Sequence, residues 1–188
     1  FTATPVLGVV GTTGTLGLSG TTSGVVTIQP ASVAGTWSLT LPTSGGSANQ
    51  FLQTNGSGVG SWSNISTLGT SVATTSGTSI DFTGIPAGVR FIALSWIGGS
   101  GTGTSNPLFQ IGDAGGIEET GYLGSGVNQA GGTANYTTGF GINQAAAASV
   151  FHGVLLLFLE KAATFTWGVI GIFGQSNGAA GNYVGGSK

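Results

Sequence analysis

Apolar and polar residues alternate with the two-residue period of β-strands over much of the second half of the chain. The clearest case is residues 164–173, where one face carries Phe165, Trp167, Val169, Gly171 and Phe173. Further candidate strands, separated by Gly-rich turns, cover residues 79–83, 90–97, 107–111, 133–142 and 150–160. Short strands at such spacing predict an all-β fold, with an antiparallel β-sandwich that is jelly-roll-like.

Residues 150–160 are apolar on both faces of the strand they predict. One face carries Val154, Leu156 and Phe158, and the other carries Leu155, Leu157 and Leu159. A strand with this pattern is buried on both sides, whereas the outer face of a two-layer sandwich normally meets water. We therefore expect an oligomer interface that includes Leu155, Leu156 and Leu157. Lys161-Ala162-Ala163 predicts a turn that joins this strand to residues 164–173, and a helix over residues 155–163 is the competing interpretation.

The first part of the chain has strand signals but few residues that could form a core. Val25–Ile28 is one candidate, and residues 36–41 are another, with Trp37, Leu39 and Leu41 on one face before Pro42 ends the strand. Residues 50–54 and 59–62 flank a strong turn signal, Asn55-Gly56-Ser57-Gly58, and predict a β-hairpin. Because a lone hairpin is marginally stable in water, we expect partner copies to cover Trp37, Leu39 and Leu41.

Glycines recur at every third position from Gly8 to Gly20, which is the spacing of a collagen triple helix. No proline falls within this run, and the spacing fails after Gly20. A Gly/Thr-rich extended connector is therefore the alternative that we favour over a triple helix.

Charge divides the chain into two regions. Only 4% of the 188 residues are charged, and the first of them is Asp81. A soluble segment without charge is hard to keep monomeric, so we expect residues 1–66 to be a fibrous connector within an oligomer and residues 67–188 to be a β-sandwich head domain. A hydrophobic content of 39% and a mean hydropathy of +0.36 indicate that the chain folds.

The composition also excludes several classes of partner and site. Three basic residues and a net charge of −2 cannot provide the positive surface that nucleic-acid binding requires. The longest apolar run, residues 154–159, is too short for membrane insertion. The absence of Cys removes disulfides and thiolate metal sites, and the absence of Met indicates that Phe1 is not a translation start.

Several stretches resemble known virion proteins. The segments GLSGTTSGVVTIQPA (17–31) and AGTWSLTLP (34–42), with the QTNGSG (53–58) hairpin turn, resemble the connector of bacteriophage tail fibres and related virion fibre proteins. The segments SIDFTGIPAGVR (79–90) and QIGDAGGIEETGY (110–122) are similar to the distal β-domain that follows such connectors. The resemblance implies a homotrimer in the virion, with an intertwined β-connector, other virion proteins at its N-terminal side, and a head that meets the host surface.

Three patterns in the sequence are candidates for a catalytic or metal site, and the same residues also fit structural roles. Glycan hydrolysis needs two carboxylates, and Asp113 could meet Glu118 or Glu119 across a loop, although Asp113 also fits a turn that it stabilises itself. The same residues with backbone carbonyls would be a calcium site, but they lack EF-hand spacing. Residues 174–178 match a serine nucleophile elbow, yet no acid or His follows them. We therefore expect no enzyme activity, no cofactor and no metal, and a structural role for His152 in a core or interface.

Aromatic and amide side chains in the predicted loops are the best material for binding a bacterial surface glycan or protein receptor, because rings stack on sugars and amides contact hydroxyls. The weak candidates for receptor binding are Tyr122, Asn128, Gln129, Asn135 and Tyr136. The sequence thus predicts a tail-fibre-type protein that attaches a bacteriophage to its host. The alternatives are a capsid head fibre or decoration protein with a structural role, and a polysaccharide depolymerase.

Overall fold

The computed structural model describes residues 12–73, 75, 77–143, 147, 149–176 and 181–188. The secondary-structure elements within these residues are all β-strands, so the fold is all-β. The chain divides into two compact units, Phe1–Thr70 and Ser71–Lys188. The boundary predicted after residue 66 differs from this division by four residues.

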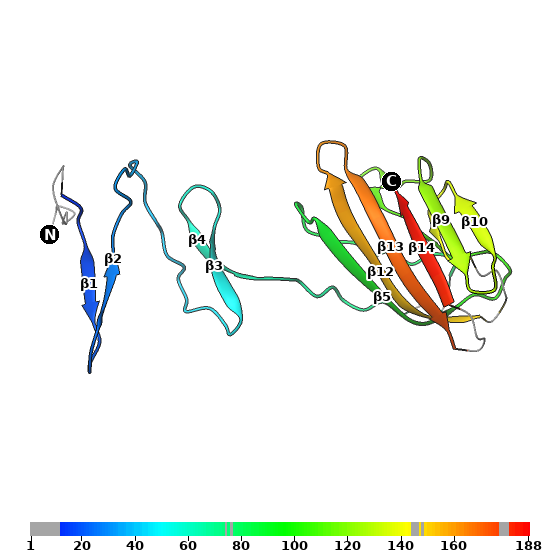
Figure 1. Ribbon diagram of the computed structural model, residues 1–188, viewed down its shortest axis with the longest axis horizontal. Helices are drawn as coiled ribbons and strands as arrows, with labels where there is room; N and C mark the ends of the chain where they lie inside the picture. Colours follow the sequence, from blue (N-terminus) through cyan, green and yellow to red (C-terminus); the bar gives the residue numbers. More distant parts are fainter. Residues whose placement is uncertain (1–11, 74, 76, 144–146, 148, 177–180) are drawn as a thin grey trace. The chain divides into compact units, whose positions relative to one another are not determined.

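The N-terminal unit contains two antiparallel hairpins (Figure 1). β1 (Leu16–Ser19) pairs with β2 (Val25–Ile28), and β3 (Gln50–Thr54) pairs with β4 (Gly60–Asn64). The prediction of strands at 25–28 and of a hairpin across residues 50–62 is confirmed. The collagen alternative is wrong at Gly17, which lies inside β1; Gly8 and Gly11 lie outside the described residues.

The β3–β4 turn shows how its sequence sets its conformation. The Asn55 side-chain oxygen accepts hydrogen bonds from the backbone N–H groups of Ser57 (2.9 Å) and Val59 (3.2 Å). Gly58 has a positive φ of 83°, and a Cβ there would collide with the Ser38 carbonyl, so only glycine fits. The predicted strand 36–41 is reduced to a single parallel bridge between Thr40 and Val59.

The described residues of the N-terminal unit form no hydrophobic core of their own. Among its described residues, Gly60 alone is buried, and it has no side chain. Trp37 and Leu41 remain about two-thirds exposed at 68% and 65%, and Leu39 is 46% exposed. Their predicted place at an oligomer interface stays a prediction, but nothing within the described part of this unit covers them.

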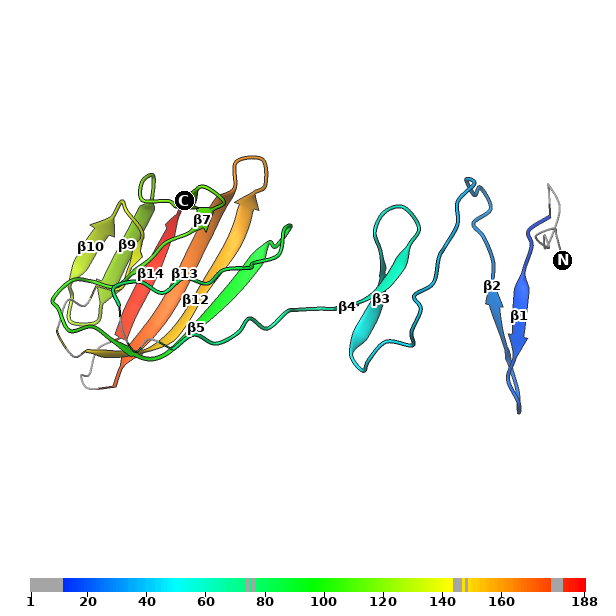
Figure 2. The same cartoon turned by 180° about the vertical axis from the view of Figure 1, so that it is seen from behind.

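The C-terminal unit is built on one six-stranded antiparallel sheet, in the order β10-β9-β14-β13-β12-β5. The strands are β5 (Phe91–Ser100), β9 (Leu123–Asn128), β10 (Thr133–Tyr136), β12 (Val150–Lys161), β13 (Thr166–Gln175) and β14 (Gly181–Ser187). A second layer crosses one face of this sheet, as Figure 2 shows from behind. It consists of connecting loops with two short pairs, β6 (Leu108–Phe109) with β11 (Phe140–Gly141) and β7 (Gly112–Asp113) with β8 (Gly116–Ile117).

The strand predictions are correct where apolar residues alternate and incomplete where glycine dominates. The predicted hairpin around Lys161-Ala162-Ala163 is confirmed as β12 and β13, and the helix alternative over 155–163 is wrong. No strand forms at residues 79–83. The central strand β14 and its neighbour β9 were not predicted, because sequences such as GNYVGGS and LGSGVN carry too few apolar residues to show alternation.

The core lies between the sheet and the covering loops. The sheet contributes Phe151, Leu155, Leu157, Val169, Phe173 and Val184, and the second layer contributes Phe109, Tyr122, Phe140 and Ile142. The Phe109 ring stacks on Phe173 with centroids 5.4 Å apart. The prediction that Leu155 and Leu157 lie at an oligomer interface is therefore wrong: both side chains point to the face that the chain itself covers, where they are 1% and 5% exposed.

We expect Leu155→Ala to lower the free energy of unfolding of the C-terminal unit by about 2–5 kcal/mol, because it opens a cavity in the core. The matched control is Ile85→Ala in the segment before β5, where the side chain is 53% exposed and lies outside the sheet, so that its removal should cost less than about 1 kcal/mol. Chemical denaturation followed by tryptophan fluorescence measures both. Equal losses for the two variants would contradict the placement of Leu155 in the core.

Candidate functional site: the open face of the sheet

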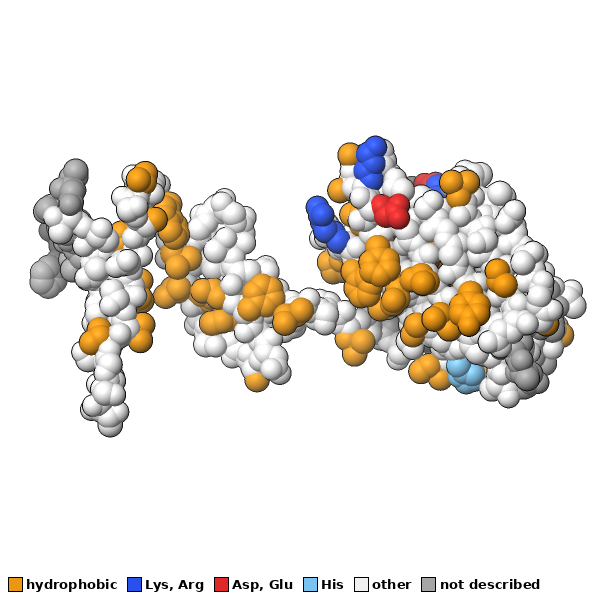
Figure 3. All heavy atoms as spheres, in the orientation of Figure 1, with side chains coloured by type: hydrophobic (Ala, Val, Ile, Leu, Met, Phe, Trp, Pro, Cys, Tyr) orange, Lys and Arg blue, Asp and Glu red, His pale blue; other side chains and the backbone are white. Residues whose placement is uncertain are grey.

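The face of the six-stranded sheet that points away from the core is apolar and uncovered. We call it the open face, and its exposed large side chains are Phe91, Ile97, Leu123, Val127, Val154, Phe158, Ile170, Ile172 and Tyr183. Leu156 lies among them and is half-buried. Figure 3 shows hydrophobic side chains spread over this face. The predicted interface role of Leu156 stays a prediction, and this residue does lie on the open face.

Strand register makes the open face continuous. Leu156 lies opposite Ile170, and Val154 lies opposite Ile172. Ile172 in turn lies opposite Tyr183 on β14, and Tyr183 lies opposite Val127 on β9. Cross-strand neighbours of this kind are close enough to pack side by side, so an apolar stripe runs across four strands.

The open face carries a pair of large rings on one side and a hollow on the other. On β5 and β12, the rings of Phe91 and Phe158 lie with their centroids 5.2 Å apart; we call them the aromatic pair. On β13, β14 and β9, the small residues Ser125 and Gly185 leave a hollow of about 460 Å³. Ile170, Ile172, Tyr183 and Val127 also line this hollow.

Besides Glu160, the β12 residues of the open face include one more polar side chain, His152. A bulge in β5 places Gly98 beside it, and the Gly98 N–H donates a hydrogen bond to His152 Nδ1 at 3.2 Å. The predicted hydrogen-bond partner is thus present, although His152 is exposed rather than in the core. Ser176, the serine of the elbow pattern, follows β13, and Asn177 and Gly178 of that pattern lie outside the described residues.

Three of the five predicted receptor-binding residues have structural roles. Tyr122 is 1% exposed, and its hydroxyl accepts a hydrogen bond from the Ile111 N–H at 2.8 Å, so its predicted contact with a receptor is wrong. Asn128 closes the turn after β9, because its side-chain oxygen accepts a hydrogen bond from the Gly132 N–H at 2.9 Å, and its amide nitrogen donates to the Asn143 carbonyl at 3.0 Å. Tyr136 is half-buried, and its hydroxyl accepts a hydrogen bond from the Asn106 amide at 2.8 Å.

The other two predicted residues are exposed near the same edge of the sheet. Asn135 lies on β10, the edge strand, opposite Ser125. Gln129 follows β9, and its side-chain oxygen accepts a hydrogen bond from the Gly181 N–H at 3.1 Å. Asn135 is exposed, so a ligand with hydroxyl groups can reach its side-chain amide.

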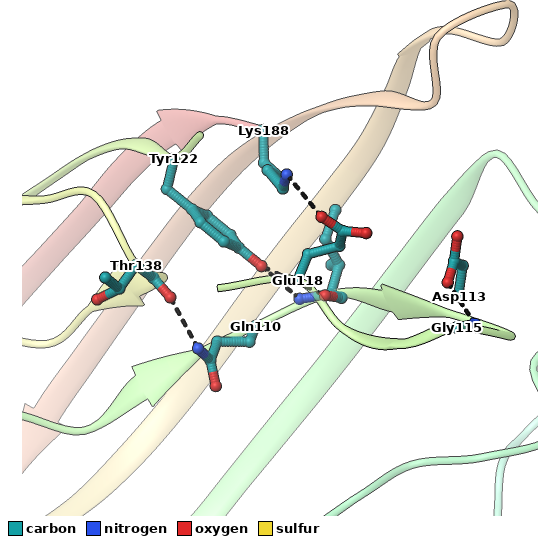
Figure 4. A network of polar contacts seen from close by, with 8 residues as sticks. Gln110, Asp113, Gly115, Glu118, Tyr122, Thr138 and Lys188 are labelled. Atoms are coloured by element: carbon teal, nitrogen blue, oxygen red, sulfur yellow. Dashed lines mark hydrogen bonds and ion pairs between the residues drawn. The ribbon is translucent and has the colours of Figure 1, made fainter. Parts of the chain in front are cut away.

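Asp113 and Glu118, one of the carboxylate pairs predicted for catalysis, make separate contacts. Glu118 pairs with Lys188, at 3.2 Å between Oε2 and Nζ, while Asp113 Oδ1 accepts a hydrogen bond from the Gly115 N–H at 2.6 Å. Figure 4 shows the two groups as separate contacts. Asp113 thus stabilises its own turn. Within the described residues, no three metal-ligating side chains lie together.

Tyr122 and Lys188 fasten the C-terminal end of the chain to the covering layer. Lys188 Nζ lies 5.4 Å from the centroid of the Tyr122 ring, and Lys188 also exchanges backbone hydrogen bonds with Trp167. Burial raises the pKa of the Tyr122 hydroxyl; the hydrogen bond with the Ile111 backbone lowers it, and the Glu118 carboxylate raises it further. Burial also raises the pKa of Tyr136. Both hydroxyls are thus held in their neutral form by the fold.

The comparisons add no relative: no family model, no curated protein and no solved structure matches this chain. Of the residues that the structure describes, none forms a helix with the length and hydropathy of a membrane span.

The sequence interpretation missed most of the open face. Ile170 and Ile172 flank Gly171 on β13, so residues 166–175 are two-faced in the same way as residues 150–160. The apolar residues on the second face of β13 are the sequence signal that identifies Ile170 and Ile172. Tyr183 could not be found in this way, because it is surrounded by small and polar residues.

We expect Tyr122→Phe to lower the free energy of unfolding by about 1 kcal/mol, because it removes the hydroxyl's hydrogen bonds to the Ile111 backbone. In the wild-type protein, the raised pKa means that the unfolded state loses its proton first as the pH rises. Stability is therefore fully present below the unfolded tyrosine pKa of about 10 and falls as the pH rises from there through the folded pKa. Denaturation at increasing pH measures this loss, which should be smaller in Tyr122→Phe; an equal loss in both proteins would contradict the assignment.

Proposed function

We propose that this protein is a virion fibre protein of the bacteriophage tail-fibre type, which attaches the virus to a bacterial surface. In this proposal the N-terminal unit is the intertwined connector, the C-terminal unit is the jelly-roll-like head, and the chain assembles as a homotrimer in the virion. The N-terminal side would contact other virion proteins. The proposal combines the sequence resemblance with the properties of the two units.

The observation that carries the proposal is the N-terminal unit without a core. Its hairpins present Leu16, Leu18, Val26 and Ile28 to solvent, and no charged residue precedes Asp81. Such a segment gains stability only when its apolar side chains pack against other chains, as in a fibre shaft. An uncharged segment with exposed apolar side chains is not expected in a monomeric enzyme or binding domain.

A binding role for the head fits its chemistry better than catalysis does. Asp113 and Glu118, which a polysaccharide depolymerase would need, have separate structural contacts. The exposed amide of Asn135 at the sheet edge offers a donor and an acceptor to sugar hydroxyls. We therefore assign glycan binding to the outer edge of the sheet at β10, with Asn135 as the leading contact.

We expect the fluorescently labelled full chain to bind intact bacteria of its host range within a panel of strains, and periodate oxidation of the surface sugars to abolish this binding. Asn135→Ala should weaken binding about three- to tenfold, as expected for the loss of one or two hydrogen bonds. The matched control is Asn64→Ala on β4, which should bind normally. Quantitative flow cytometry measures all three proteins.

Failure of the wild-type chain to bind any strain would contradict the attachment role. Binding that Asn135→Ala does not weaken would contradict the assigned glycan contact. Release of reducing sugars from purified surface polysaccharide, lost in Asp113→Asn or Glu118→Gln, would favour the depolymerase instead. Antibody labelling of particles by electron microscopy locates the chain on the tail or on the capsid.

A further inference from the structure

We propose that a second copy of this chain covers the open face, with the aromatic pair of one copy seated in the hollow of the next. This inference does not depend on host attachment, since a decoration protein would need the same cover. It also concerns the C-terminal unit alone, which has its own core and nevertheless leaves one face of its sheet bare.

The size of the open face argues for a macromolecular partner. Nine large apolar side chains there are between 39% and 81% exposed. Together they present on the order of 800 Å² of accessible surface, judged from the roughly 150–250 Å² that an aromatic side chain can bury. The largest patches on ordinary monomers are about 300–600 Å², whereas about 800 Å² is what each partner contributes to a standard protein interface.

The chemistry of the face argues for a second copy rather than a glycan or a charged partner. Among the strand positions that form the stripe from Phe91 to Val127, no described side chain is acidic or basic. Glu160 lies at the end of β12, beyond the aromatic pair, and Figure 3 shows the charged side chains gathered toward one end. A polar ligand would leave its groups unpaired against this surface. Another copy presents an equally uncharged stripe, and association through the N-terminal unit would hold it at high effective concentration.

The shape of the face is self-complementary, and the two matching parts are too far apart to meet within one copy. Phe158 on β12 and Ser125 on β9 are separated by β13 and β14. Three strand spacings of about 4.8 Å place them at least about 14 Å apart. The aromatic pair can therefore fill only the hollow of a neighbour. Two copies that exchange their pairs form a dimer, and copies that each pass the pair to the next form a closed ring.

Cross-linking tests this arrangement in the full chain, which has no native cysteine. In the variant Ser125→Cys/Phe158→Cys, a disulfide within one copy is excluded, because the limit for a disulfide is about 7 Å between Cα atoms. Mild oxidation should give covalent dimers or larger species that a reductant reverses, and peptide mass spectrometry should find residue 125 linked to residue 158. The matched control is Ala130→Cys/Thr137→Cys, two exposed positions outside the apolar stripe, which should give at least about tenfold less product.

A third substitution tests whether the hollow matters. Adding Ile172→Asp to the cysteine variant places a charge in the lining of the hollow and should lower the cross-linking yield at least tenfold. Thr104→Asp, at an exposed position in the loop between β5 and β6 and away from the open face, should leave the yield unchanged. Three results would overturn the proposal. They are the absence of covalent dimers or larger species, links only between two copies of residue 125 or two copies of residue 158, and a cross-linking yield that Ile172→Asp does not change.

Tyrosine nitration tests the same proposal without any substitution. Tyr183 lines the hollow and is 50% exposed in the single copy, whereas Tyr122 is buried and Tyr136 is half-buried. If a second copy covers the open face, tetranitromethane should modify Tyr183 of the native protein at least tenfold more slowly than in the urea-unfolded chain. Rapid nitration of Tyr183 in the native oligomer would show an uncovered face and overturn the proposal.

Discussion

The chain has enough apolar side chains to make two-faced strands but covers only one face of the sheet that they form. Along β12, Leu155 and Leu157 pack under the chain's own loops, while Val154 and Phe158 on either side of them remain exposed. This follows from the two-residue period of a strand, since consecutive side chains must point to opposite faces. The second layer crosses one side only, so the uncovered side depends on something outside the single chain.

The same shortage of cover shapes the N-terminal unit in a more extreme form. There the hairpins are held by backbone hydrogen bonds and by turn residues such as Asn55, and no described side chain is buried. Isolated two-stranded hairpins are marginal in water. The absence of charge removes the usual barrier to association. Both units therefore point to a protein whose native state contains several copies, with the C-terminal unit closer to independence.

The sequence predicts the strands that alternate and the hairpins that have clear turn signals. It identifies β12 as two-faced, but alternation alone does not say which face the chain will cover, so Leu155 and Leu157 were placed at the wrong surface. Strands β9 and β14 escape prediction because glycine replaces the side chains that would show a pattern. Glycine is used there for close approach: a Cβ at Gly126 would lie 2.6 Å from the Gly141 carbonyl oxygen. Tyr122 resembles an exposed loop residue in sequence, and only the tertiary structure shows that its ring meets Phe140 in the core.

The central claim is that one copy cannot cover its own apolar surface. The most direct measurement is the molar mass of the purified full chain by light scattering after size-exclusion chromatography, across dilution into the micromolar range. The account predicts a stable oligomer whose molar mass is at least twice the 18.3 kDa of one chain, with three copies expected from the fibre resemblance. A folded, soluble monomer that persists at these concentrations would contradict it.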